Sequence, residues 1–375
     1  GDGVDGAERG DLAEVLRRRA LGSDAARPEA VSKRHGRGLR TARENVEDLC
    51  DDGSFVEYGS LAIAAQRRRR DVEDLMRSTP ADGLIGGIGR VDGRPTVVVS
   101  YDYTVLAGTQ GYVNHHKKDR LFEIAERDRL PVVLFAEGGG GRPGDVDAPV
   151  VSGLDVMAFH LFARLSGKVP LVAVVAGRCF AGNAALAGCC DVIVGVEGAN
   201  LGMGGPAMIE GGGLGVVAPE EIGPLDTQVA NGVVDVAVGD EATAVAVARR
   251  YLSIVDGEST TAQHAAQELL RDLVPERRTR TYDVRRVMEV LFDSDSVLEL
   301  RGGWGSPMIT AVARLGGHAV GVMANDPVHL GGAIDTDAAT KAADFLLRCD
   351  AVGLPVVSMC DTPGFMVGPD EEQRG

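Results

Sequence analysis

Short runs of Val, Leu and Ala alternate along the chain with longer segments in which apolar and charged positions mix. The aliphatic runs predict strands and the mixed segments predict helices. Strands are predicted at 96–100, 131–136, 171–176 and 192–196, and helices at 114–129 and 153–166. Alternation at this spacing indicates an α/β fold with largely parallel strands. Residues 1–30 lack a strong apolar period, so a frayed terminus or the end of a linker is expected there.

An internal repeat organises the chain. A shift of 224 residues aligns GRVDGRPTVVVSYDYTVLAG with ARLGGHAVGVMANDPVHLGG, and LPVVLFAEGGGGRPG with LPVVSMCDTPGFMVG, without a gap. A period this long predicts duplicated domains rather than a solenoid. The predicted units are an N-terminal extension at 1–32, an N-terminal domain at 33–260 and a C-terminal domain at 261–375. The second unit stops soon after Gly368, so we expect it to be truncated.

Composition and charge narrow the class of protein. The 51 glycines and 16 prolines fall short of low complexity, and 44% hydrophobic residues exclude disorder. A net charge of −16 argues against general nucleic-acid binding. No uncharged run approaches the ~18 residues of a membrane span, so a soluble, cytoplasmic protein is predicted. The six cysteines show no CxxC spacing, which favours reduced, buried thiols and no zinc.

Conventional catalytic motifs are absent from the sequence. Gly139, Gly141 and Gly144 fit GxGxxG after a strand, but no strand–loop–helix opens the chain, so dinucleotide binding is disfavoured. No GxSxG, HExxH or Walker motif occurs. Basic clusters at 33–37, 67–70, 115–118 and 277–280 are most simply solvent-facing, and one of them is a candidate for holding a phosphorylated ligand.

The segment GRCFAGNAALAGCCD, residues 177–191, follows a predicted strand and consists almost entirely of small residues. The turn at Ala181 and Gly182 should lead directly into a helix whose first N–H groups lack partners, which is an anion or oxyanion site. The alternative is a small-residue helix packed closely on the sheet without any ligand. Both interpretations remain open from composition alone.

These segments together carry a family resemblance. KRHGRGLRTAREN, TPADGLIGGIGRVDG, EGGGGRPG, GRCFAGNAALAGCCD, GGWGSPMITAVARLGG and CDTPGFMVG occur in an order that resembles the carboxyltransferase (beta) component of biotin-dependent acyl-CoA carboxylases of the propionyl- and acetyl-CoA type. The resemblance extends from about residue 33 to the end. It implies two duplicated crotonase-like domains of ββα units, and a homo-oligomer, a dimer-based ring of hexamer size, in which one subunit's N-half meets another's C-half.

The resemblance also implies a reaction without a side-chain base. A carboxyl group passes from carboxybiotin to the α-carbon of an acyl-CoA, through an enolate held by backbone N–H groups. The implied residues are Ala181 and Gly182 (catalytic), Gly138, Gly139, Gly140 and Arg142 (acyl-CoA side), and Pro363, Gly364 and Phe365 (biotin side). The second oxyanion turn is expected beyond Gly375.

The implied cofactor is biotin, carried on a domain that this segment does not contain. The implied partners are biotin carboxylase and the biotin carboxyl carrier, with no nucleic acid and no membrane. Two alternatives stay open: a biotin-dependent acyl-CoA decarboxylase on the same fold, and a non-catalytic scaffold subunit. The sequence does not distinguish the acyl group used or whether the partner domains are fused.

Overall fold

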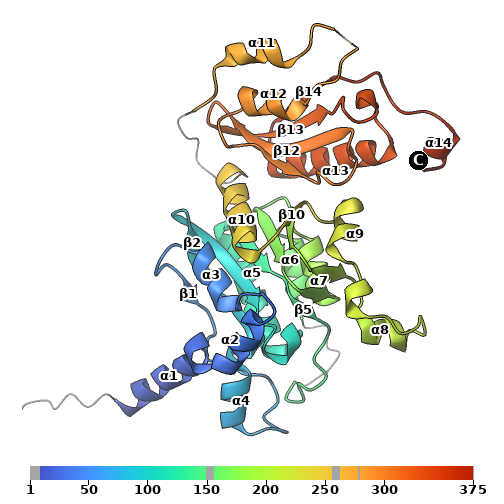
Figure 1. Cartoon of the computed structure of the whole chain (residues 1–375). Helices are drawn as coiled ribbons and strands as arrows, with labels where there is room; N and C mark the ends of the chain where they lie inside the picture. Colours follow the sequence, from blue (N-terminus) through green and yellow to red (C-terminus); the bar gives the residue numbers. More distant parts are fainter. Residues whose placement is uncertain (1–8, 149–155, 256–261, 278, 375) are drawn as a thin grey trace, which may run out of the picture.

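The computed structural model describes residues 9–148, 156–255, 262–277 and 279–374. Its largest sheet has the strand order β1-β2-β3-β4-β6-β8-β10, and a second has the order β11-β12-β13-β14. Figure 1 shows the first sheet and its helices in the lower body and the second sheet in the upper body. The strands of the first sheet are β1 (Val56–Glu57), β2 (Leu84–Val91), β3 (Arg94–Tyr101), β4 (Val132–Phe135), β6 (Leu171–Val175), β8 (Val192–Val196) and β10 (Val236–Val238).

Helices cover both faces of the first sheet. The alternation of β-strand side chains sends Val97 and Val99 into one core and Val98 into the other. The first core contains residues of α5 (Tyr112–Asp128), α6 (Ala158–Ala163) and α7 (Gly182–Gly188), and the second contains residues of α3 (Ala42–Leu49) and α10 (Glu241–Val255). β1 to β3 pair antiparallel, whereas β3, β4, β6, β8 and β10 pair parallel. The predicted α/β class is confirmed.

The 224-residue repeat holds in the structure residue by residue. β2, β3, α5 and β4 become β12 (Met308–Leu315), β13 (His318–Asn325), α13 (Thr336–Val352) and β14 (Val356–Met359), with every boundary displaced by the same number. Loop contacts repeat as well: Gln110 N–H donates to the Gly140 carbonyl at 2.9 Å, and Ile334 N–H to the Gly364 carbonyl at 3.0 Å. The predicted boundary at residue 260 lies outside the described residues.

Helix α10 joins the two sheets. Its Tyr251 and Leu252 share one apolar core with β6 and β8 of the first sheet and with Leu300 and Val312 of the second. An ionic cluster adds to this junction: the carboxylate of Asp235, 1% exposed, lies 3.2 Å from Arg301 and 3.1 Å from Arg348. The two units are therefore packed on each other through α10.

The N-terminal segment corrects a sequence expectation. Residues 10–35 form α1 (Gly10–Leu21), a short 3-10 turn and α2 (Pro28–His35). Arg27 forms an ion pair of 2.7 Å with Asp102 at the end of β3, and the guanidinium of Arg18 donates to the Leu61 carbonyl at 3.0 Å. The expectation of a frayed end or linker is wrong for these residues, because long-range ion pairs rather than a local apolar period hold them.

The remaining elements complete the two bodies, and among them α12 buries Val284 and Met288 against the second sheet. They are α4 (Val72–Ser78), α8 (Pro206–Gly211), α9 (Leu225–Ala230), α11 (Leu270–Leu273), α12 (Val284–Leu291), α14 (Pro369–Arg374) and β11 (Leu298–Leu300). The helix predicted at 153–166 is shorter, since α6 spans Ala158–Ala163 and 153–155 lie outside the described residues. Cys360 is exposed, contrary to the prediction of buried thiols. Among the described residues, no helix is long and apolar enough to cross a membrane.

Candidate functional site

A small parallel sheet brings two glycine-bearing segments together. β5 (Gly138–Gly139) pairs with β7 (Arg178–Phe180), which pairs with β9 (Asn200–Gly202). Gly138, Gly139 and Gly140 have φ values of 83°, 146° and 78°, which L-residues with a side chain rarely adopt. A Cβ on Gly139 would collide with the Phe180 carbonyl group. Glycine is therefore needed here for close approach, and the predicted loop lies beside the predicted turn.

The turn itself differs from expectation in one respect. Ala181 has φ 50° and ψ −122°, a strained conformation for a non-glycine residue, and it leads directly into α7. The Ala181 N–H already donates to the Gly202 carbonyl at 3.1 Å. Ala181 therefore cannot offer this N–H to an oxyanion, and its part is to shape the turn. In the described residues, no hydrogen bond occupies the N–H of Gly182, which opens α7.

The space around Gly182 is narrow. A Cβ added there would lie 2.9 Å from Cζ of Phe159 and 3.4 Å from Cγ of Gln110. Phe159 comes from α6 and Gln110 from the loop before α5, so three elements meet over this glycine. A free N–H in a site walled by side chains suits a single small oxyanion.

Arg142 anchors the glycine-rich loop to the neighbouring segments. Its guanidinium is 5% exposed, forms an ion pair with Asp82, lies 3.6 Å from Asp145, and donates from Nε to the Thr109 hydroxyl at 3.1 Å. Burial raises the pKa of Asp82, and Arg142 opposes that rise. These partners already engage the Arg142 guanidinium, which ties the loop to Asp82 and Thr109.

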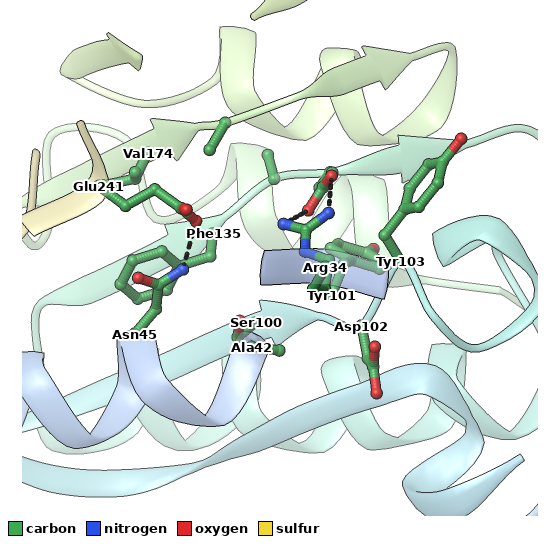
Figure 2. Close-up of a pocket in the computed structure, with 13 residues that line it drawn as sticks. Arg34, Ala42, Asn45, Ser100, Tyr101, Asp102, Tyr103, Phe135, Val174 and Glu241 are labelled. Atoms are coloured by element: carbon green, nitrogen blue, oxygen red, sulfur yellow. Dashed lines mark hydrogen bonds and ion pairs between the residues drawn. The ribbon is translucent and has the colours of Figure 1, made fainter. Parts of the chain in front are cut away.

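A buried ion pair anchors the start of the same loop, and sequence reasoning missed it. Arg34 of α2 donates to both carboxylate oxygens of Glu137, at 2.6 and 2.7 Å. Figure 2 shows Arg34 between the strand ends, with Asn45 donating to Glu241 nearby. The cavity beside them holds about 10 Å³, room for one water. Burial raises the pKa of Glu137 to about 7, against the opposing effect of Arg34.

Arg34→Met is expected to lower the free energy of unfolding by roughly 3 kcal/mol at pH 8, because it leaves a buried carboxylate unpaired. Glu137 has a raised pKa when folded, so its protonation stabilises the fold at low pH and this stability is lost as pH rises. Without Arg34 that pKa rises further. The deficit should therefore widen between pH 5.5 and pH 8.5 in urea titrations.

Arg40→Met is the matched control for this substitution. Arg40, six positions after Arg34, forms an ion pair with Asp48 at the surface. Its loss is expected to cost less than about 1 kcal/mol at every pH. An Arg34 variant as stable as the Arg40 variant at pH 8 would contradict the anchoring role of the Arg34–Glu137 pair.

The cluster from His115 to Lys118 corrects another expectation. His115, Lys117 and Lys118 are buried rather than solvent-facing, and only His116 is exposed. Burial lowers the pKa of His115 to about 3, of Lys117 to about 8 and of Lys118 to about 7. Lys117 donates to the Ala81 carbonyl at 2.9 Å and to the Leu84 carbonyl, at the turn before β2. This helix therefore carries a polar interior under the loops of the site.

A second, larger cavity of about 310 Å³ opens beside α2. Exposed Lys33 and Arg37 line it together with Tyr103, Thr104 and Ala107, which belong to the loop after β3. Two cations facing a loop that continues into Gln110 are suited to an anionic group such as a phosphate. This cavity matches the predicted basic cluster at 33–37, except that Arg34 itself is taken by Glu137.

The predicted biotin-side residues lie in the loop that follows β14 of the second sheet. Pro363, Gly364 and Phe365 follow β14 and occupy the place that the glycine-rich loop has after β4. Phe365 is 75% exposed, and Tyr282 donates to Asp361 at 2.8 Å. Within this chain they follow a strand of the second sheet, whereas Gly182 opens α7, which packs on the first sheet. Among the described residues, no group of three His, Cys, Asp or Glu could hold a metal ion.

Residues 33–375 match the carboxyl transferase domain family. The methylmalonyl-CoA carboxyltransferase 12S subunit of Propionibacterium freudenreichii subsp. shermanii is 32% identical over 92% of this chain and 67% of its own length. The biotin-dependent long chain acyl-coenzyme A carboxylase beta4 subunit of Mycobacterium tuberculosis is 32% identical over 97% of this chain and 70% of its own.

Solved structures of related carboxylases and transcarboxylases also match this chain. A single-chain, multi-domain long-chain acyl-CoA carboxylase is 58% identical with a TM-score of 0.93, and 98% of this chain covers 37% of that protein. The transcarboxylase 12S structure, a hexamer with methylmalonyl-coenzyme A bound, is 30% identical with a TM-score of 0.84, over 98% of this chain and 74% of that one. The chain thus spans about two thirds of these curated relatives and little more than a third of the multi-domain carboxylase.

Proposed function

Because this chain belongs to the carboxyl transferase domain family, as the order of its motifs predicted, we propose that it carries the transfer of a carboxyl group between biotin and the α-carbon of an acyl-CoA. One observation supports this most directly. Among the described residues, nothing accepts a hydrogen bond from the N–H of Gly182, at a turn that the β5–β7 pairing holds against the glycine-rich loop. Such a preorganised donor stabilises the enolate oxygen of a thioester by about 3 kcal/mol.

The protein groups act on the acyl thioester by placement and by donation. Gly182 donates to the thioester oxygen as negative charge develops there, and Ala181 fixes the turn that presents it. Gly138, Gly139 and Gly140 allow the neighbouring loop to approach without Cβ atoms. Arg142, held by Asp82 and Thr109, keeps that loop in place.

The second unit is proposed to face biotin. When bound, biotin on its carrier supplies the carboxyl group and a basic ureido group for the α-proton. The residues present fit the bicyclic head of biotin, because Phe365 exposes an aromatic face for its thioether ring and the Gly364 carbonyl accepts the same backbone hydrogen bond as that of Gly140. Pro363 and Phe365 would therefore line the biotin pocket. Biotin carboxylase and the carrier are the proposed partners.

Oligomerisation is part of the proposal. Large apolar side chains lie in and around α8, with Met203, Met208, Leu214 and Val216 between 65% and 84% exposed. Exposed apolar surface of this extent is typical of a subunit interface. We expect the full-length protein to form a dimer-based ring, as the hexameric 12S relative does. Light scattering of the full-length protein checks this.

The cavity beside α2 is proposed to hold phosphate groups of coenzyme A. Arg37→Glu is expected to raise the KM for acyl-CoA by roughly tenfold with little change in kcat, because it reverses one of two cations that face the cavity. Arg286→Glu makes the same charge change at an exposed position of α12 and should leave KM unaltered. Equal KM values for the two variants would remove the cavity from the CoA site.

The function is tested with the full-length protein that contains this chain, together with biotin carboxylase and its biotinylated carrier, and supplied with ATP, radiolabelled bicarbonate and acyl-CoAs from two to eighteen carbons. We expect acid-stable label in the acyl-CoA product. We expect the highest activity with long-chain acyl-CoAs, because the 58% identical relative is a long-chain acyl-CoA carboxylase. Carboxyacyl-CoA breakdown without any forward reaction would favour a decarboxylase. Binding of no acyl-CoA at all would favour a scaffold subunit.

A further inference from the structure

A buried polar network lies directly behind the turn at Gly182. Lys118, on α5, donates to the hydroxyl of Tyr101 at 2.8 Å and to the side-chain oxygen of Gln110. The amide nitrogen of Gln110 donates to Tyr101 at 2.8 Å and to the side-chain oxygen of Asn183. Lys118 is fully buried, and among the described residues its ammonium group bonds to neutral side chains, with Asp119 and Asp82 acting only at longer range. Burying an ammonium group in this way is costly and calls for a reason.

The network reaches three backbone segments of the proposed site. Asn183 follows Gly182 in α7, and its amide nitrogen donates to the carbonyl of Gly108 at 3.0 Å and to that of Glu137 at 2.7 Å. Gln110 adds a link through its own backbone N–H, which donates to Gly140 at 2.9 Å. The turn, the loop after β3 and the glycine-rich loop are thus joined by one continuous set of hydrogen bonds that begins at Lys118.

The second unit shows that the fold itself does not need this network. At the same 224-residue shift, Gln110, Lys118 and Tyr101 correspond to Ile334, Ala342 and Asn325. The strands and the helix nevertheless have the same boundaries in both units. The β-bridge between the two loops also recurs, as Gln110 with Gly141 and as Ile334 with Phe365. By contrast, the adjacent buried Lys117 does recur, as Lys341, which donates to the Trp304 carbonyl at 2.9 Å. Lys117 therefore belongs to the shared ββα scaffold, and Lys118 belongs to the first unit alone.

We propose that Lys118 is a positioning residue that acts through Gln110 and Asn183 to hold the Gly182 N–H at the place where the thioester oxygen becomes negative. This inference rests on the proposed function. The physical need is clear from the turn, because Ala181 is strained and stays in its conformation only if its surroundings fix it. The lowered pKa of Lys118 is consistent with a group whose burial is tolerated for this purpose.

The test compares Lys118→Met with Lys117→Met in the full-length protein. Methionine keeps most of the side-chain volume and removes the ammonium group, and both lysines are buried on the same helix. We expect Lys118→Met to lower kcat by at least ~10-fold with KM within threefold, because sub-ångström misplacement of a catalytic donor is costly. Lys117→Met is expected to lower the melting temperature while kcat per folded enzyme stays within threefold.

A second variant keeps the test decisive if Lys118→Met does not fold. Tyr101→Phe/Lys118→Met also removes the hydroxyl that loses its hydrogen bond from Lys118, so one buried polar group fewer is left short of a partner. The same loss of kcat in this variant supports the proposal. A folded Lys118 variant with kcat within twofold of the wild type, or an equal loss in Lys117→Met, overturns it. An inactive wild-type protein contradicts the proposed function instead.

Discussion

Replacing Gly182 by valine is expected to lower kcat for acyl-CoA carboxylation by at least ~10²-fold. The new branched side chain would stand where Phe159 Cζ is only 2.9 Å from an added Cβ, so it would fill the space beside the free N–H. Loss of one oxyanion donor costs about 3 kcal/mol of transition-state stabilisation. Steady-state kinetics with the preferred acyl-CoA measure the effect, and circular dichroism checks that the variant is folded.

The control for this substitution is one position earlier. Ala181→Gly removes a side chain at φ 50°, so it is expected to relieve strain, raise the free energy of unfolding by about 1 kcal/mol and leave turnover within a factor of three. Unchanged kcat in Gly182→Val would remove this N–H from the mechanism. A large loss of kcat in Ala181→Gly would show that turnover needs the strained conformation that alanine imposes at position 181.

Gly139→Ala is expected to destabilise the protein on the order of 4 kcal/mol and to abolish measurable turnover. At φ 146° the backbone rejects a side chain, and the Cβ would overlap the carbonyl group of Phe180, so β5 and β7 could not stay paired. The loop and the turn would separate as a result. Urea unfolding and the same kinetic assay measure the two effects.

A graded series in one loop provides the comparison. Gly140→Ala meets nothing within 4 Å but has φ 78°, so only backbone strain of about 1 kcal/mol is expected. Gly141→Ala has neither obstacle and should behave as the wild type. Equal stability of the Gly139 and Gly141 variants would contradict the close packing of β5 on β7.

Sequence reasoning found the parts of this molecule that depend on local pattern. Buried strands such as β4 and β8 are uninterrupted aliphatic runs, and the repeat is visible because both units keep the same spacing between turns. The turn at Gly182 is a candidate from the sequence because small residues follow a buried strand there, although the same pattern also fits a closely packed helix without a ligand. Family, fold class and the neighbourhood of the two glycine segments were therefore predictable.

What sequence reasoning missed depends on contacts between distant residues. Lys118 looks like a surface residue of a basic helix, and only the tertiary arrangement shows that Tyr101 and Gln110 lie within hydrogen-bond reach. Arg34 finds Glu137 more than a hundred positions away. The N–H of Ala181 is taken by Gly202, which no spacing rule indicates. Buried polar residues such as Lys118 break the apolar period of a helix, so the sequence pattern does not show that they are buried.

Helix α10 has a consequence for how the molecule comes apart. Since Tyr251 and Leu252 lie in one core with strands from both repeats, breaking the chain between the repeats would leave apolar side chains of each half in water. The two repeats seen in the sequence are thus duplicated units, but they do not unfold as separate cooperative units. Heating should melt both halves in one calorimetric transition. A destabilising substitution in either repeat should therefore lower the melting temperature of both.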